Sequence, residues 1–365
     1  MVNCKRGDRM QETIEKMLLT LQEASKNENF INKHKSKETD FIRKRNLSFE
    51  DTTNFIVGNL GTNLDFEVLN FCSGRMKGVS AAAVSKARDK IKYTAFEEIF
   101  RKSAKDVPVK HAYKGYRLSA FDGMEGELPK TEELMKACAT PTKNKYPQFH
   151  AIAEYDVLNC CYTNAIFELG TTDERKAALE LLENHDYEGL EIFLLDRGFA
   201  SIKLILALEK SGKKYVMRVS NSFLREVNDF RISKSKDKTI EVDYDKRRAA
   251  TSKVSGIEFP CVFRIRCVKI ELNNGEDEIL ITNLGKSEFT RKELGELYFL
   301  RWKIETGFLN LKYAVCIEDF MSKKENGIKQ EFFASLTKSN IFMQFVEVAN
   351  EIIYNKKNDK TRIQG

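Results

Sequence analysis

The order of the elements predicted between residues 116 and 220 is the feature that most constrains how this chain can fold. Three stretches come first and are predicted as strands, the second and third as a hairpin: YRLSAFDG, QFHAIAEYDVL and CCYTNAIFELG. A helix opened by Thr171 or Thr172 follows in TDERKAALELLENH. Two apolar strands, LEIFLLDRGFA and KKYVMRVS, then flank a helix in SIKLILALEKSG. This order predicts an α/β fold with a mixed sheet and flanking helices.

The regions on either side of this segment have different patterns. Residues 1–110 are predicted to form a helical N-terminal region, with Ser48 and Ser80 as helix N-caps. Residues 111–220 form the first part of the core, and residues 221–286 are a β-rich insertion with strands such as TIEVDY, FRIRCVKIEL and DEILITNL. Helical periodicity returns in residues 287–365, which complete the core.

The positive charge of the chain is concentrated in its first third. Residues 1–115 hold 22 Lys and Arg against 15 Asp and Glu, whereas the remaining 250 residues hold 39 of each. The formal net charge of +7 therefore arises before residue 116. Such an excess favours a segment that meets a polyanion, and Lys86, Arg88 and Lys90 are the predicted DNA contacts within it. The alternative is a solvated basic helix face.

Composition also excludes several classes of protein. The hydrophobic fraction of 42% is sufficient for a folded core. No apolar run approaches the roughly 20 residues that span a bilayer, and the N-terminus has no signal-peptide pattern. Eight cysteines form no CxxC pair, and four histidines have no zinc-finger spacing. We therefore expect a cytoplasmic protein with reduced thiols and no membrane partner.

Residues 298–312, YFLRWKIETGFLNLK, are predicted to form one amphipathic helix. At about 100° per residue, Tyr298, Arg301, Glu305 and Lys312 fall in one narrow stripe. An apolar stripe lies directly beside it and consists of Leu297, Leu300, Ile304, Phe308 and Leu311. The polar stripe therefore borders the core. The alternative is an ordinary ion pair between Arg301 and Glu305.

Two aspartates stand where predicted strands end, Asp122 in AFDG and Asp196 in LLDRGF. In open sheets flanked by helices, functional sites gather at the carboxyl ends of strands, although either residue alone would also suit a turn or a helix N-cap. With Glu305, the sequence offers three carboxylates that one sheet edge could bring together. Oxygen donors of this kind suit Mg²⁺ or Mn²⁺, and two such ions can clamp the oxygens of a phosphoryl displacement.

These residues carry a resemblance to a known family. The spacing of Tyr298, Arg301, Glu305 and Lys312 resembles the YREK signature of bacterial DDE transposases of the insertion-sequence-four family. LLDRGF is similar to the second-Asp motif of that family, and YPQFHAIAEYDVLN and TDERKAALELL resemble its usual surroundings. The resemblance spans roughly residues 75–350.

The resemblance implies a fold, a metal site and a reaction. The fold is a ribonuclease H-like core interrupted by a β-rich insertion between the second Asp and the Glu. Asp122, Asp196 and Glu305 would bind two divalent ions, Mg²⁺ or Mn²⁺. Family members cut at the ends of a mobile element through metal-activated water and then use the freed 3′-hydroxyl as nucleophile. One departure is DGMEGELP after the first Asp, where the family often has Gly-Ser, so that Glu125 and Glu127 compete with Asp122.

The resemblance also implies contacts with DNA. Tyr298, Arg301 and Lys312 correspond to signature residues that contact phosphates near the cut. Trp302 corresponds to an aromatic position beside the signature, where a base could stack; a packed helix tryptophan is the alternative. We therefore predict a DNA transposase that acts as a homodimer on terminal inverted repeats and on target DNA. The alternatives are a non-catalytic DNA-binding remnant and a metal-dependent nuclease without joining activity.

Overall fold

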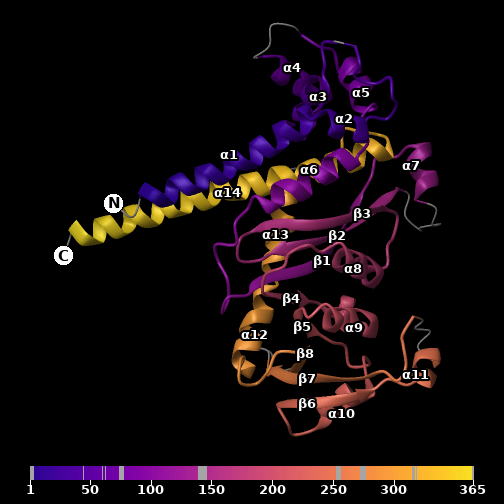
Figure 1. Cartoon of the computed structure of the whole chain (residues 1–365), viewed down its shortest axis with the longest axis vertical. Coiled ribbons are helices and arrows are strands. Elements are labelled where there is room, and N and C mark those ends of the chain that lie inside the picture. Colours follow the sequence, from indigo (N-terminus) through magenta and orange to yellow (C-terminus); the bar gives the residue numbers. More distant parts are fainter. Residues whose placement is uncertain are drawn as a thin grey trace.

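The structure is a computed structural model of the whole chain. It describes residues 4–43, 45–59, 61, 63–73, 78–138, 146–251, 256–271, 277–314, 317 and 319–363; for residues 4–11, 351, 352 and 354–363 it describes the backbone alone. A helical layer lies over one end of a long mixed sheet, as Figure 1 shows. None of the described helices has the length and apolar character that crossing a membrane requires.

Helices fill the described part of the first 110 residues. Ser48 begins one of them through a capping box, in which its hydroxyl accepts the Asp51 N–H and the Asp51 carboxylate accepts the Ser48 N–H, each at 3.0 Å. Ser80 caps another, as its sequence context predicts. The helices here are α1 (Cys4–Lys26), α2 (Glu28–His34), α3 (Phe49–Gly58), α4 (Leu64–Cys72), α5 (Ala81–Arg88) and α6 (Thr94–Lys105).

The described strands form one sheet in the order β3-β2-β1-β4-β5-β8-β7-β6. The β1–β2 and β2–β3 pairs are antiparallel, whereas β4 runs parallel to both β1 and β5. The order β3-β2-β1-β4-β5 with these directions is that of a ribonuclease H-like sheet, which confirms the predicted fold class. These strands are β1 (Arg117–Glu127), β2 (Gln148–Asp156), β3 (Cys161–Leu169), β4 (Glu191–Leu195) and β5 (Lys214–Arg218).

Three helices and a short 3₁₀ turn connect these strands. They are α7 (Glu132–Ala137), α8 (Glu174–Glu183), η1 (Arg197–Phe199) and α9 (Ile202–Lys210). The N-cap of α8 differs from the sequence prediction, because Asp173 rather than Thr171 or Thr172 accepts hydrogen bonds from the first helical N–H groups. A carboxylate suits this position because it also interacts favourably with the helix dipole.

The segment predicted as a β-rich insertion extends the same sheet. Its last strand, β8 (Asp277–Thr282), pairs antiparallel with β5, and β7 (Val262–Glu271) and β6 (Asp237–Asp243) follow outward. Two helices that the sequence analysis did not predict lie in this segment, α10 (Arg225–Ile232) and α11 (Lys246–Thr251). Both are short and polar on much of their surface, which weakens their periodic signal.

Side chains alternate between two hydrophobic layers along the central strands. On β1, Leu118 and Ala120 belong to the layer under α12 (Arg291–Leu300) and α13 (Lys303–Ala314), whereas Phe121 belongs to the layer under α8 and α9. Ile192 and Phe193 divide in the same way on β4. The period of two along a strand therefore decides which face each functional side chain reaches.

The prediction of one helix over residues 298–312 was wrong, because α12 and α13 are separate helices. Arg301 ends α12, and its N–H bonds to the Tyr298 carbonyl at 3.1 Å, while the Trp302 N–H bonds to the Phe299 carbonyl at 3.3 Å. These bonds span three residues instead of four and tighten the chain into a turn. The apolar periodicity continues across this turn, so the sequence pattern contains no break.

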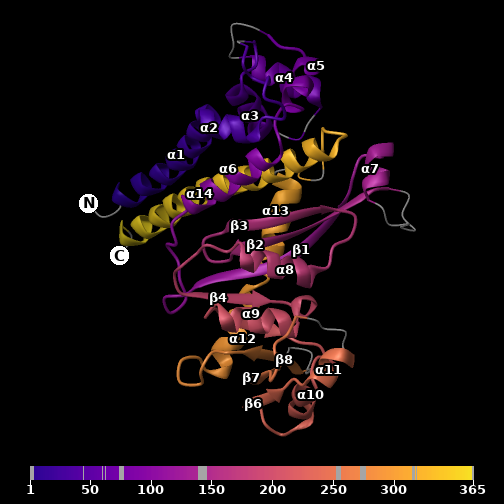
Figure 2. The same cartoon turned by 45° about the vertical axis from the view of Figure 1, so that its right-hand side comes forward.

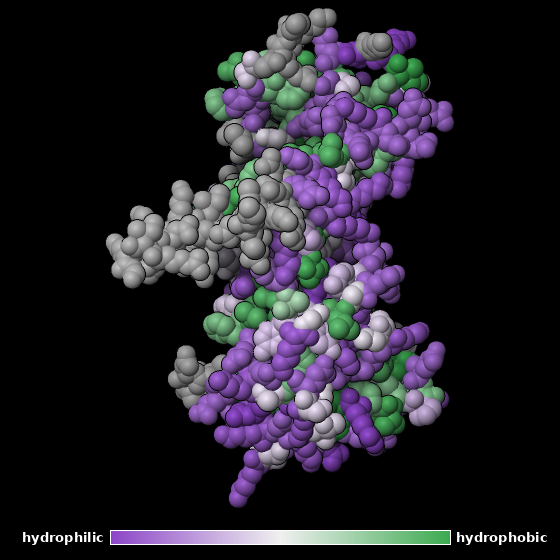
Figure 3. Space-filling model, turned by 60° about the vertical axis from the view of Figure 1, so that its left-hand side comes forward, coloured by the Kyte–Doolittle hydropathy of each residue, from purple (hydrophilic) through white to green (hydrophobic). Residues whose placement is uncertain are grey.

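The long helix α14 (Glu325–Ile363) returns to the N-terminal helices. It packs against α6, α1 and α3, and Figures 1 and 2 both show α1 and α14 side by side. One hydrophobic cluster includes residues of α3, α6, the sheet and α14, such as Phe55, Phe100, Leu118 and Phe332. The described part of the face in Figure 3 is mostly hydrophilic, with hydrophobic residues scattered over it.

Candidate active site

Asp122 and Asp196 lie side by side on neighbouring parallel strands. The last paired residues of β1 and β4 are Phe121 and Leu195, so each aspartate is the next residue beyond that pair. Residues in register on adjacent strands point to the same face, about 4.8 Å apart along the hydrogen-bonding direction. Both aspartates therefore follow Ala120 and Leu194 toward the layer under α12 and α13.

The prediction that β1 ends at Asp122 was wrong. The strand continues to Glu127 because β2 keeps pairing with it, with Asp122 opposite Ala153. Only β4 stops here: Asp196 precedes the turn η1 and leaves the edge of β1 open on that side. Asp122 therefore lies in the middle of β1, at the point where β1 loses β4 as its neighbour.

The turn between α12 and α13 delivers three side chains to the two aspartates. Tyr298 donates its hydroxyl to Asp196 Oδ1 at 3.1 Å. Arg301 Nη1 lies 3.1 Å from Asp122 Oδ2, and Arg301 Nη2 lies 3.0 Å from Glu305 Oε1. The guanidinium thus links one carboxylate of β1 to one of α13. The predicted Arg301–Glu305 pair exists, but as part of this larger cluster.

Burial and like charges shape the electrostatics of the cluster. The side chain of Arg301 is 4% exposed, whereas those of Asp122 and Glu305 are 23% and 40% exposed. Burial raises the pKa of Asp122, and Glu305 and Asp196 raise it further against the opposing effect of Arg301. Burial and the Asp196 carboxylate also raise the pKa of Tyr298, so its hydroxyl stays a donor at neutral pH. Arg301 is thus a buried cation that Asp122 and Glu305 share.

The remaining predicted signature residues lie around this cluster. Lys312 is exposed on α13, seven residues beyond Glu305 and so about two turns along the same side of the helix. Trp302 is 52% exposed, with its ring 5.6 Å from the Arg301 guanidinium. This exposure argues against the packed tryptophan and leaves one ring face accessible.

The competing acids Glu125 and Glu127 do not approach the cluster. Glu125 is three residues beyond Asp122 on β1, so it points to the opposite face, where it lies 3.9 Å from His150 Nδ1. Glu127 is exposed at the end of the strand. Asp122 is thus the acid of DGMEGELP that lies beside Asp196.

Sequence reasoning missed residues that hold this edge in place. Arg175 Nε donates to the Gly198 carbonyl at 3.1 Å, which ties the start of α8 to η1. The Glu174 carboxylate fits between Gly123 and Gly198, since a Cβ on either glycine would lie within 2.9 Å of one of its oxygens. A glycine closely follows each aspartate, Gly123 directly and Gly198 after Arg197, and was the available signal, although these glycines make room for Glu174.

A third side chain at this edge also escaped prediction. β5 runs parallel to β4, and its last residue, Arg218, follows the Leu195–Met217 pair just as Asp196 does. Arg218 Nη1 lies 3.9 Å from Asp196 Oδ1, and Arg218 Nη2 lies 2.6 Å from Glu278. A charged residue closing an apolar strand, KKYVMR, was the available signal.

The prediction that Arg88 contacts DNA has to be corrected, because the structure buries this side chain. It is 6% exposed, and each of its three nitrogens bonds to α14, to Gln330, Glu331 and the Gly327 carbonyl, so this buried guanidinium does not face a DNA surface. Lys86 is exposed and Lys90 is partly exposed. Both line a groove together with basic residues that sequence reasoning did not single out, Lys37, Arg43 and Arg45. The motif FIRKRN was the available signal for the two arginines.

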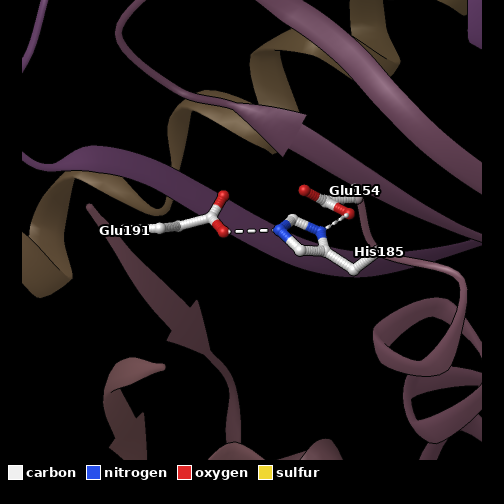
Figure 4. Close-up of side chains that lie close together, drawn as sticks. All are labelled: Glu154, His185 and Glu191. Carbon is white, nitrogen blue, oxygen red and sulfur yellow. Dashed lines mark hydrogen bonds and ion pairs between the residues drawn. The ribbon is translucent and has the colours of Figure 1, made fainter. Parts of the chain in front are cut away.

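A separate buried cluster lies at the opposite end of β4, five residues before Asp196 and so about 16 Å away along the strand. His185 Nδ1 is 3.2 Å from Glu154 Oε2, and His185 Nε2 is 2.6 Å from Glu191 Oε2 (Figure 4). One possible metal-ligand atom from each of these three residues lies within 4.8 Å of those of the other two, and no other group of three or more such side chains among the described residues is this close.

This cluster already has its cations, which argues against a metal ion. Arg117 Nε lies 2.7 Å from Glu191 Oε1, Arg117 Nη2 lies 3.2 Å from Glu154 Oε1, and Lys213 Nζ lies 3.4 Å from Glu191 Oε2. Burial lowers the pKa of His185, but the contacts that its ring nitrogens make with the two glutamate carboxylates outweigh this effect and raise the pKa to about 9. A divalent ion would add positive charge to a site where Arg117, Lys213 and a protonated His185 already outnumber the two carboxylates.

The fold and the carboxylate edge together define a class of protein. A ribonuclease H-like sheet that gathers two aspartates and a glutamate at one edge belongs to the DDE enzymes, which cut and join phosphodiester bonds. Residues 113–341 match the family model of the transposase DDE domain. The chain belongs to this family and is a DDE-type DNA transposase.

A sequence relative agrees with this assignment. The chain is 24% identical over 329 residues to the transposase InsG for insertion sequence element IS4 from Escherichia coli (strain K12), which covers 85% of this chain and 73% of the relative. The predicted relationship to the insertion-sequence-four transposases is confirmed. Among solved structures, a piggyBac transposase synaptic complex with hairpin DNA matches with a TM-score of 0.49 and 13% identity, over 91% of this chain and 75% of that chain.

Proposed function

We propose that Asp122, Asp196 and Glu305 bind two Mg²⁺ or Mn²⁺ ions and that the chain uses them to cut the ends of a mobile element and join them to target DNA. The observation that carries this proposal is the placement of Arg301 between Asp122 and Glu305 while Tyr298 binds Asp196. Family membership implies use of a divalent metal; the identity and number of the ions are our inference.

The residues present fit such ions. All three groups offer oxygen donors, which hard divalent cations prefer, and burial already makes the charge of Asp122 costly. Arg301 and Arg218 supply two positive charges for the three carboxylates, and Arg218 also pairs with Glu278, so the cluster lacks positive charge. When bound, the ions would supply an activated nucleophile and stabilise the charge that develops on the phosphate oxygens.

The protein side chains then have distinct roles. Tyr298 holds the Asp196 carboxylate through its hydroxyl and keeps that role at neutral pH because its pKa is raised. Arg301 partly compensates the charges of Asp122 and Glu305, and if these carboxylates held cations its guanidinium would be free to donate to phosphate oxygens. Lys312 supplies a further cation on the same side of α13, and the exposed face of Trp302 offers a surface for an unstacked base.

The DNA partners follow from this chemistry. We propose that terminal inverted repeats contact the signature side chains and also the groove lined by Lys86, Lys90, Lys37, Arg43 and Arg45. Cationic side chains on such a surface bind the phosphate backbone by releasing counterions. A homodimer would pair two ends, as the resemblance implies.

An assay of the full chain with its own element ends tests this proposal. With Mg²⁺ or Mn²⁺, the wild type should nick and join these ends, and Asp122→Ala, Asp196→Ala and Glu305→Ala should each abolish both steps. Asp186→Ala, an exposed acid at the opposite end of the sheet, is the matched control. Equal nicking by wild type and the three variants would refute the mechanism. DNA binding without nicking would indicate a non-catalytic remnant, and hydrolysed but unjoined ends would indicate a nuclease.

A further inference from the structure

A groove lined by arginines adjoins the candidate active site on the face of the sheet opposite to α12 and α13. It has a volume of about 680 Å³ and is lined by side chains of η1, α8, α10 and α11. Its charged side chains are Arg175, Arg197, Arg225, Arg247, Arg248 and Asp245. Because Arg197 directly follows Asp196, the groove begins at the aspartate edge. We call it the arginine groove.

The charges of this groove are only partly compensated. Arg248 is held by Glu226 through two contacts of 2.8 and 3.0 Å. Arg225 lies 3.9 Å from Asp229, a distance at which an exposed pair contributes little. Arg197 and Arg247 are exposed and have no carboxylate within ion-pairing distance among the residues that the structure describes. The surface therefore presents unpaired guanidinium groups.

The groove and the signature residues approach the same edge from opposite faces. Ala200, Leu224 and Tyr244 of the groove belong to the hydrophobic layer under α8 and α9, whereas Tyr298 belongs to the layer under α12 and α13. Figure 1 shows α12 and α13 on one side of the sheet and α9 and α11 on the other. A DNA segment in the groove would thus approach the end of β4 from the face opposite to Tyr298 and Arg301.

Resting on the proposed function, we infer that the arginine groove binds the backbone of target DNA during joining. Cutting an end requires one DNA segment at the carboxylates, whereas joining requires a second segment whose phosphate meets the freed 3′-hydroxyl. The signature side chains serve the first segment from one face, and the groove serves the second from the other. Guanidinium groups bind phosphates in a bidentate manner that carries no sequence information, which suits a target without a fixed sequence.

The test separates target binding from end cutting. Arg247→Ala and Arg247→Glu in the full chain are compared with Arg264→Ala, a matched control whose side chain is 77% exposed on β7. Binding of a short duplex unrelated to the element is measured by fluorescence anisotropy over a range of salt concentrations. Joining of a pre-cut end into a plasmid and cutting of an intact end are measured in parallel.

We expect Arg247→Ala to weaken binding of the unrelated duplex about 10-fold and to lower the salt-dependence slope by about 1. Arg247→Glu should weaken it further, and Arg247→Lys should keep the wild-type slope because it keeps the charge. Joining should fall in parallel with binding, while cutting of intact ends keeps its wild-type rate.

Three outcomes would overturn the inference. Unchanged binding and joining would show that the groove does not hold target DNA. Equal loss of cutting and joining would show that it holds the element end instead. Losses as large in Arg264→Ala would show an effect of overall charge. If the wild type binds the duplex but never cuts, the proposed function fails. The duplex-binding comparison of the variants would then still test whether the arginine groove binds DNA.

Discussion

Arg301 and Asp122, 179 residues apart in sequence, form a contact of 3.1 Å at the edge of the sheet. Removing Arg301 would leave Asp122, whose pKa burial already raises, without its guanidinium partner, and removing Asp122 would leave the 4%-exposed Arg301 side chain paired with Glu305 alone. Because the same guanidinium also contacts Glu305, Arg301 connects β1 to α13. The buried arginine therefore stabilises the carboxylates in the absence of metal.

Replacing Arg301 should make the protein depend on divalent cations. Without the guanidinium, Asp122 and Glu305 repel each other, and Arg301→Ala should cost the metal-free protein about 2–4 kcal/mol of unfolding free energy. Mg²⁺ should then raise the stability of Arg301→Ala more than that of wild type, since no side chain competes for the carboxylates. Urea unfolding with and without Mg²⁺ measures both effects. An equal Mg²⁺ increment in the two proteins would contradict the proposed site.

Arg88 and Lys86 should respond in opposite ways to truncation, although both belong to one basic run. Arg88→Ala removes the partner of Glu331 at a buried site and should cost about 3–5 kcal/mol of unfolding free energy. Lys86→Ala changes an exposed residue and should alter stability by less than about 0.5 kcal/mol.

DNA binding provides the second readout for this pair. Lys86→Ala should weaken binding of an element end and lower the salt slope by about 1, because one phosphate contact is lost. Thermal unfolding and anisotropy measured on the same samples make the comparison. A destabilised Lys86→Ala protein would contradict the exposed, DNA-facing role of Lys86. A fully stable Arg88→Ala protein would contradict the structural role of Arg88.

Local pattern predicted much of the core of this fold. LEIFLLD signals a buried strand and its end because its apolar run stops at a charged residue, and β4 and Asp196 follow it closely. Asp122 was harder to place, because β1 continues past it on account of pairing with β2, which a single strand's sequence does not encode. The residues of the candidate site could thus be predicted from the sequence. The open side of β1 beside Asp122, which depends on where β4 stops, could not.

Long-range contacts explain what the sequence pattern could not reveal. Arg88 is buried by α14, more than 240 residues later, so nothing in KARDK distinguishes it from Lys86 or Lys90. The turn at Arg301 lies within an unbroken apolar periodicity. The structural reason for this turn is the contact of the Arg301 guanidinium with both Asp122 on β1 and Glu305 on α13, which the sequence pattern does not reveal.

The buried His185 should make stability fall at alkaline pH. Its folded-state pKa of about 9 lies above the ordinary value of 6.5, so its protonated form is stabilised by Glu154 and Glu191. This contribution is complete below pH 6.5 and is lost as pH rises through about 9; the shift corresponds to about 3 kcal/mol at most. Urea unfolding of wild type and His185→Gln across this range measures it.

The control for this prediction is His111→Gln, because the His111 side chain is 58% exposed and paired only with Glu347 among its charged neighbours in the described chain. The wild type and His111→Gln should lose stability in parallel between pH 6.5 and 9, whereas His185→Gln should show a much flatter profile. Identical profiles for all three proteins would mean that His185 is not protonated in the folded state.

Alanine at the two glycines beside the aspartates should reveal the role of Glu174. In Gly198→Ala the new Cβ meets only the Glu174 carboxylate, the mobile end of a side chain, so the cost should be about 1 kcal/mol. In Gly123→Ala it also meets the ring of His150 at 3.1 Å and Ile152 at 3.2 Å, both buried, so the cost should be about 1–3 kcal/mol.

A Glu174→Ala background separates these causes. There, Gly198→Ala should cost almost nothing, because the atom that it displaced is gone, whereas Gly123→Ala should keep most of its cost through His150 and Ile152. The coupling energies come from urea unfolding of each single and double variant. If Glu174→Ala rescued neither glycine variant, the carboxylate would not be what fills the space between Gly123 and Gly198; if it rescued both equally, His150 and Ile152 would not be what limits Gly123→Ala.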